Sequence, residues 1–164
     1  MHRYVFFLTI FLLLLLPASA FGGEPGVMIE FRARCVEGNP CQFSGEMIEV
    51  ELELFNAGST AIGLPIAYFR GQGPRVILVD NHSGKEKRLG MGPPMSDLFD
   101  EIQELAPGKS IKIPWMVAPD EIDAFALRPV DVTAVFVFDL MPRSPYAESQ
   151  FIRAPLRIVA AGAH

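Results

Sequence analysis

Strict alternation of apolar and charged side chains is the feature that most constrains how this chain folds. It is clearest from Ile48 to Leu54, where aliphatic residues alternate with Glu49, Glu51 and Glu53. Successive side chains of a β-strand point to opposite faces, so this segment predicts a strand with one buried and one solvated face. Similar alternation recurs from residue 27 onward, whereas segments with helical apolar spacing are short or absent. The chain is therefore predicted to be all-β.

Turn residues divide this pattern into seven to eight predicted strands. A bent or edge strand is expected from Ala61 to Phe69, because Gly63 and Pro65 interrupt that segment. Trp115, the only tryptophan, is expected in the core. Short strands without intervening helices favour an immunoglobulin-like β-sandwich of antiparallel strands, built as a single domain over residues 21–164. The other strands are expected over residues 27–34, 48–54, 75–80, 85–89, 111–117, 130–140 and 152–158.

The first twenty residues resemble a secretory signal peptide. Arg3 gives a positive start, Phe6 to Leu16 is strongly apolar, and Ala18-Ser19-Ala20 is a small-x-small cleavage pattern. The apolar run is too short for a membrane-spanning helix, which needs about 20 residues. We expect cleavage near Ala20, export to the periplasm or the extracellular space, and a mature form that does not span the membrane; an uncleaved anchor is the alternative.

The charge balance argues against a nucleic-acid partner. The chain has 14 Lys plus Arg and 19 Asp plus Glu, and loss of Arg3 with the signal leaves 13 against 19, a net charge of −6. An acidic surface repels phosphate unless it carries a concentrated basic patch. Lys85, Lys87 and Arg88 form the densest basic group, and Glu86 interrupts it. Nucleic-acid binding is not expected.

The two cysteines, Cys35 and Cys41, flank a Gly-Asn-Pro turn. In an oxidising compartment such a close pair favours a disulfide. A redox site would need Cys-x-x-Cys at the start of a helix, which this spacing does not give. A structural disulfide is expected, with a redox or metal role as the alternative.

No residue pattern indicates an enzyme, a metal site or a cofactor. The chain lacks the G-x-S-x-G, phosphate-loop and H-E-x-x-H patterns. His82 falls in a predicted hairpin turn, and with no second suitable histidine a zinc site has too few ligands. An acidic cluster between Asp97 and Glu104 is expected to be a solvated face, with a weak cation site as the alternative.

The segment from Gly45 to Leu140 resembles bacterial immunoglobulin-like domains that include the BsuPI-type proteinase inhibitors. The resemblance rests on the glutamate-alternating strand that ends at an Asn-x-Gly turn, on Asp80-Asn81-His82-Ser83-Gly84-Lys85, and on Leu105-Ala106-Pro107-Gly108-Lys109-Ser110 before the strand with Trp115. It implies a β-sandwich and, as a hypothesis, proteinase inhibition. The chain departs from that group in its signal sequence and in Arg128-Pro129-Val130, where such domains carry a Pro-Gly-x-Tyr entry.

Binding is the function that the loops favour. Three loops are expected at the end of the sandwich opposite the cysteine turn: the loop after Asn56, residues 90–100 and residues 141–149. Aromatic, methionine and arginine side chains are enriched at interface centres. We therefore predict a non-enzymatic exported domain that binds a protein or a cell-envelope component. A secreted proteinase inhibitor is the alternative function, and rings that only cap the core are the structural alternative. The candidate contact residues are Tyr68, Phe69, Arg70, Met95, Phe99, Arg143 and Tyr146.

Overall fold

The structure is a computed structural model that describes residues 28–140 and 150–162. The expected signal segment, residues 1–20, lies outside the described residues. So does the loop over residues 141–149, and with it the candidate contact residues Arg143 and Tyr146.

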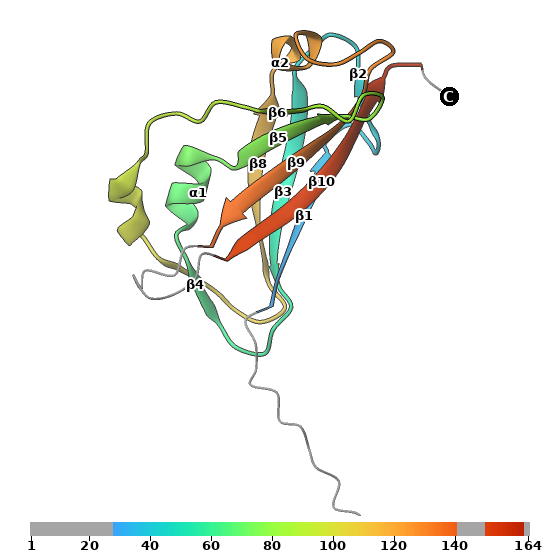
Figure 1. The fold of residues 1–164 in the computed structure, drawn as a ribbon. Helices are drawn as coiled ribbons and strands as arrows, with labels where there is room; N and C mark the ends of the chain where they lie inside the picture. The colour runs from blue at the N-terminus through green and yellow to red at the C-terminus, as the bar shows by residue number, and fades with distance from the viewer. Residues whose placement is uncertain (1–27, 141–149, 163–164) are drawn as a thin grey trace, which may run out of the picture.

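Two main β-sheets make up the body of the described chain (Figure 1). The first sheet has the order β1-β3-β8, and the second has the order β2-β10-β9-β5-β6. A third, two-stranded sheet pairs β4 with β7. The class is therefore an all-β sandwich, as predicted, and the immunoglobulin-like type stays a prediction. The strands are β1 (Ile29–Cys35), β2 (Cys41–Phe43), β3 (Ile48–Asn56), β4 (Ile62–Leu64), β5 (Arg75–Asp80), β6 (Glu86–Arg88), β7 (Gln103–Leu105), β8 (Ser110–Val117), β9 (Asp131–Asp139) and β10 (Phe151–Ala160).

The alternation on β3 sorts its side chains between core and solvent, as the sequence predicts. Leu52 and Leu54 are fully buried, and Ile113 of the adjacent β8 faces the same core. On the outer face the Arg34 guanidinium donates to Glu51 over 2.7 Å, and Lys112 lies 3.2 Å from the same carboxylate. Hydrogen bonding from Arg34 holds the pKa of Glu51 below its usual range.

The segment predicted as a bent or edge strand from Ala61 to Phe69 is different in the structure. Only β4 is a strand; Pro65 then precedes helix α1 (Ile66–Gln72), which ends at Gly73. Two other short helical segments are the 3-10 helix η1 (Ser96–Asp100) and α2 (Pro119–Asp123). No helix among the described residues is long and apolar enough to cross a bilayer.

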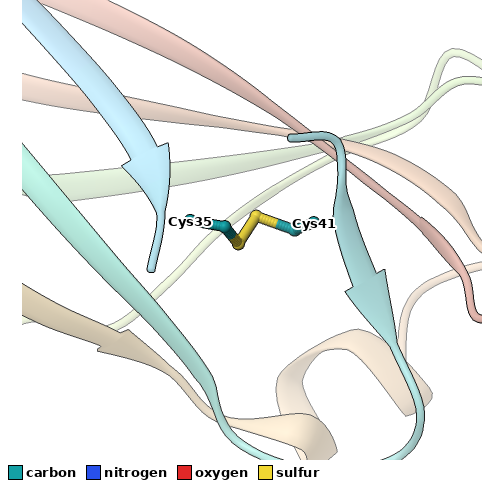
Figure 2. Close-up of a disulfide and its surroundings, with 2 residues drawn as sticks. All are labelled: Cys35 and Cys41. Atoms are coloured by element: carbon teal, nitrogen blue, oxygen red, sulfur yellow. A yellow bond between two sulfur atoms is a disulfide. The ribbon is translucent and has the colours of Figure 1, made fainter. Parts of the chain in front are cut away.

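The disulfide between Cys35 and Cys41 forms as predicted, with the two Cα atoms 5.5 Å apart. Figure 2 shows it spanning from the end of β1 to the start of β2. Strand β2 was not predicted, and it pairs in parallel with β10, unlike the antiparallel pairing expected throughout. Because β1 and β2 belong to different sheets, the disulfide fastens the point where the chain crosses between them.

Candidate functional site

Helix α1 carries three of the predicted contact residues, Tyr68, Phe69 and Arg70, and places them on different faces. Ile66, Phe69 and Gln72 share the buried face. Phe69 is 1 % exposed, and its ring centroid lies 4.7 Å from that of Phe138 in the core. Its side chain therefore packs inside the sandwich and does not reach a partner. Tyr68 is partly buried, and Arg70 is exposed.

The amide of Gln72 holds the loop over residues 90–95 against α1. Its Nε2 donates to the carbonyl of Gly92 at 3.0 Å, and its Oε1 accepts the backbone N–H of Met95 at 3.1 Å. The Gln72 residue is 8 % exposed, so the side-chain partner of both hydrogen bonds is buried, although Gly92 and Met95 are exposed. A single buried side chain thus fixes the loop at two points.

Close packing between α1 and η1 brings Tyr68 together with Phe99. The two rings stack with centroids 3.8 Å apart and planes inclined by 23°. At Gly71 an added Cβ would stand 2.8 Å from the Met95 sulfur and 2.9 Å from a Leu98 methyl group. The loop approaches the helix this closely because position 71 has no side chain.

Beside this stack lie exposed apolar side chains from two further segments. Met91 and Met95 are each 45 % exposed, and Phe151 at the start of β10 is 47 % exposed. Tyr68, Met91 and Phe151 line one shallow depression of about 40 Å³. The Arg75 guanidinium lies over the Phe151 ring, 5.7 Å from its centroid. We call this surface the α1 face: Tyr68, Met91, Met95, Phe99 and Phe151.

The structure thus brings together three of the predicted contact residues, Tyr68, Met95 and Phe99. Arg70 lies apart from them, in a groove with Trp115 and Met116. Sequence reasoning named Met91 only as part of its loop, and it missed Phe151 and the buried amide of Gln72. The last strand was predicted over residues 152–158, so Phe151 fell just before it, and only the fold reveals that Phe151 lies beside Tyr68 and Met91.

Two aspartates among the described residues have lowered pKa values because their carboxylates accept hydrogen bonds from neighbouring groups. Hydrogen bonds from Arg157, and then from Asn81, lower the pKa of Asp131 to about 2. Backbone N–H groups, led by that of Leu127, hold the pKa of Asp80 below its usual range. Within residues 28–140 and 150–162, no group of three or more His, Cys, Asp or Glu is arranged to hold a metal ion.

The α1 face is suited to apolar contact, because its exposed side chains are methionine and aromatic residues.

Comparison with known proteins gives no family. No protein-family model matches the chain, and no curated protein matches it. Among solved structures, it is similar to the structural-genomics target SoR45, with 14 % identity, a TM-score of 0.42, and coverage of 84 % of this chain and 89 % of that one. It is also similar to a β-glucosidase from Erythrobacter marinus, with 10 % identity and a TM-score of 0.41. That match covers 81 % of this chain but 16 % of the enzyme, and neither likeness bears on function.

Proposed function

We propose that the protein is an exported, non-enzymatic binding domain that engages a protein or cell-envelope partner through the α1 face. The observation that carries the proposal is an exposed apolar surface on a loop that Gln72 holds at Gly92 and Met95. Methionine and aromatic side chains are enriched at interface centres. A loop that is already held in place loses less conformational entropy on binding, which favours affinity.

The structural alternative is that these residues only close the end of the core. It accounts well for Tyr68 and Phe99, which stack together and are partly buried. It does not account for Met91 and Met95, because each residue is 45 % exposed to solvent. Contiguous exposed apolar surface of this kind is typical of interaction sites.

Proteinase inhibition, the alternative function, receives less support from the same geometry. We expect a loop that enters an active-site cleft to be extended and to have free backbone hydrogen-bonding groups. Residues 96–100 instead form the helix η1, and the backbone groups of Gly92 and Met95 are already bonded to Gln72.

Site-specific photo-crosslinking tests the binding proposal. A photoreactive amino acid is placed at Met95, and a matched control carries it at Leu127, which is 53 % exposed beside α2. In cells that express the full chain, we expect a discrete adduct from position 95 and none from position 127. Identical adducts from both positions, or none from position 95, would contradict the proposal. N-terminal sequencing of the released protein tests export, with Phe21 expected as the first residue.

A further inference from the structure

A second apolar groove lies on the outer face of the first sheet, near the disulfide. The strand register places Glu49 opposite Met116, and the Val36 amide donates to the Glu49 carbonyl. Val36, Glu49 and Met116 therefore form one row across the sheet. With Pro114 of the same face they line a groove of about 450 Å³. Trp115, which is opposite the buried Val50, and Arg70 of α1 line this groove from the β8 edge of the sheet.

A neighbouring hollow of about 480 Å³ lies beside the cysteine turn. Glu37, Glu46 and Met47 line the hollow, and Glu49 lines both spaces. We call the two adjacent spaces together the channel. Its lining residues come from the turn after β1, from the start of β3 and from β8.

The floor of the channel is apolar and open to solvent. Val36 is 61 % exposed, Met116 is 60 % exposed and Met47 is 49 % exposed. Side chains of this type are the ones most often buried in folded proteins. Three of them along one channel form a surface that gains free energy when a partner excludes water from it.

Unpaired carboxylates give the channel its charge. Glu37, Glu46 and Glu49 are exposed, and none of their side-chain carboxylates makes a hydrogen bond or ion pair within the part of the chain that the structure describes. On the same sheet face, Glu51 forms ion pairs with both Arg34 and Lys112, whereas the neighbouring carboxylate of Glu49 has no ion-pair partner among the described residues. Among the described residues that line the channel, Arg70 is the one cation, and it lines only the groove on the β8 side.

We infer that this channel binds an extended cationic segment of a partner polypeptide. In an extended segment, alternate side chains point to the same side about 7 Å apart. Apolar side chains of the partner rest on Val36 and Met116, while lysine or arginine side chains reach the carboxylates along the rim. The net charge of −5 favours the approach of such a partner. This site is separate from the α1 face and does not depend on the proposed function.

The position of Trp115 provides a direct assay. It is the only tryptophan of the chain, and it lines the channel, so its emission reports on occupancy. The probe is a peptide of about ten residues that alternates lysine with leucine. One control peptide carries glutamate in place of lysine, and another carries glycine in place of leucine. The protein is purified after expression of the full chain. We expect a saturable change with the lysine–leucine peptide, weakened by added salt, and little change with either control.

Variants identify the groups that bind. Exposed ion pairs contribute about 0.5 kcal/mol each, which corresponds to about twofold in affinity per carboxylate and about tenfold for three. The triple variant Glu37→Gln, Glu46→Gln, Glu49→Gln should therefore bind the peptide about tenfold more weakly. Glu104→Gln on β7 is the matched control and should bind as the unmodified protein does. Met95→Asp on the α1 face should also leave peptide binding unchanged.

Three results would overturn the inference. The first is equal binding of the lysine and glutamate peptides, and the second is unchanged affinity in the triple variant. The third comes from sedimentation of the protein alone: a dimer that separates on Met116→Asp would show that a second copy of the chain covers the channel instead.

Discussion

Replacement of Gly73 by alanine is expected to destabilise the protein strongly, for two reasons that can be separated. Gly73 ends α1 with φ 73° and ψ 177°, a conformation that is nearly exclusive to glycine. Its position is also covered by Trp115, since an added Cβ would lie 2.0 Å from one ring carbon and 2.2 Å from another. The only tryptophan can therefore pack at this place because residue 73 has no side chain.

The two effects have comparable magnitudes. The unfavourable backbone conformation costs about 1–3 kcal/mol. Forcing a methyl group against a packed ring costs about 1–3 kcal/mol more. Reduced freedom of the unfolded chain offsets about 0.4–1 kcal/mol of this. The net loss in free energy of unfolding is about 3 kcal/mol, which lowers the melting temperature of a domain this size by about 10 °C.

Gly84→Ala is the matched control, because Gly84 has a φ of 70° but an added Cβ would meet nothing within 4 Å. It carries the backbone cost alone, so we expect about 1 kcal/mol and a melting temperature lower by about 3 °C. Thermal unfolding measures both variants, and Trp115 emission should shift for Gly73→Ala only. In a Trp115→Ala background, Gly73→Ala should lose the steric part of its cost and keep only the backbone cost of about 1–3 kcal/mol. Equal costs for Gly73→Ala with and without Trp115 would refute the steric part of this reasoning.

Three further predictions concern other parts of the fold. The Arg157 guanidinium donates hydrogen bonds to Asp131 and lowers the pKa of that carboxyl group from 3.8 to about 2. The ionised carboxylate therefore stabilises the native state fully at pH values above 3.8, and this stabilisation is lost as the pH falls through about 2. In urea unfolding measured as a function of pH, Asp131→Asn should reduce the loss of unfolding free energy at acid pH, and an unchanged pH dependence would contradict the assignment. Phe69→Ala should lower the free energy of unfolding by about 3–5 kcal/mol because the ring is buried. Arg70→Ala should change it by less than about 0.5 kcal/mol because Arg70 is exposed. Similar losses in both variants would show that α1 does not have one buried and one exposed face. Replacing Cys35 and Cys41 together by alanine should lower the free energy of unfolding by about 2 kcal/mol, since the disulfide closes a short loop. Thermal unfolding measures this loss, and an unchanged stability would show that the disulfide does not stabilise the fold.

The sandwich was predictable wherever local pattern and burial coincide. On β3 and β9 apolar side chains recur at every second position and lie in the core, so alternation alone locates both strands. The disulfide was also predictable, because its cysteines are only six positions apart in sequence. These features depend on neighbouring residues, which the sequence displays directly.

Helix α1 and strand β2 were not predictable for a different reason. Ile66 and Phe69 are compatible with either a strand or a helix, and Pro65 gives an equally good reason for an edge strand or a helix start. Strand β2 has three residues, and its partner β10 lies more than a hundred positions further along the chain. Tertiary contacts decide both elements, and a local pattern does not contain them.

The candidate site was predictable in its composition more than in its geometry. Aromatic and methionine content drew attention to Tyr68, Met95 and Phe99, which the fold does bring together. Their arrangement depends on Gln72, a polar residue in a mainly apolar segment, and its importance comes from being buried. Phe69 shows the converse, because an aromatic residue beside two surface residues belongs to the core when the segment is helical.

Two prolines leave gaps in the backbone N–H groups along β8 and β10 of the sandwich. Hydrogen bonds at both ends of the β9–β10 pair, from Leu140 to Gln150 and from Ala160 to Val130, turn the even-numbered residues of β10 toward β9. The nitrogen of Pro155 therefore faces away from β9, and the same reasoning from the Asn56–Lys109 bond turns the nitrogen of Pro114 away from β3. A strand added at either edge would meet a position that has no N–H to donate. Addition of a partner strand is thus disfavoured along the middle of β8 and of β10. The α1 face and the channel beside the disulfide, the two surfaces proposed for binding, present side chains, so the absence of these N–H groups does not affect them.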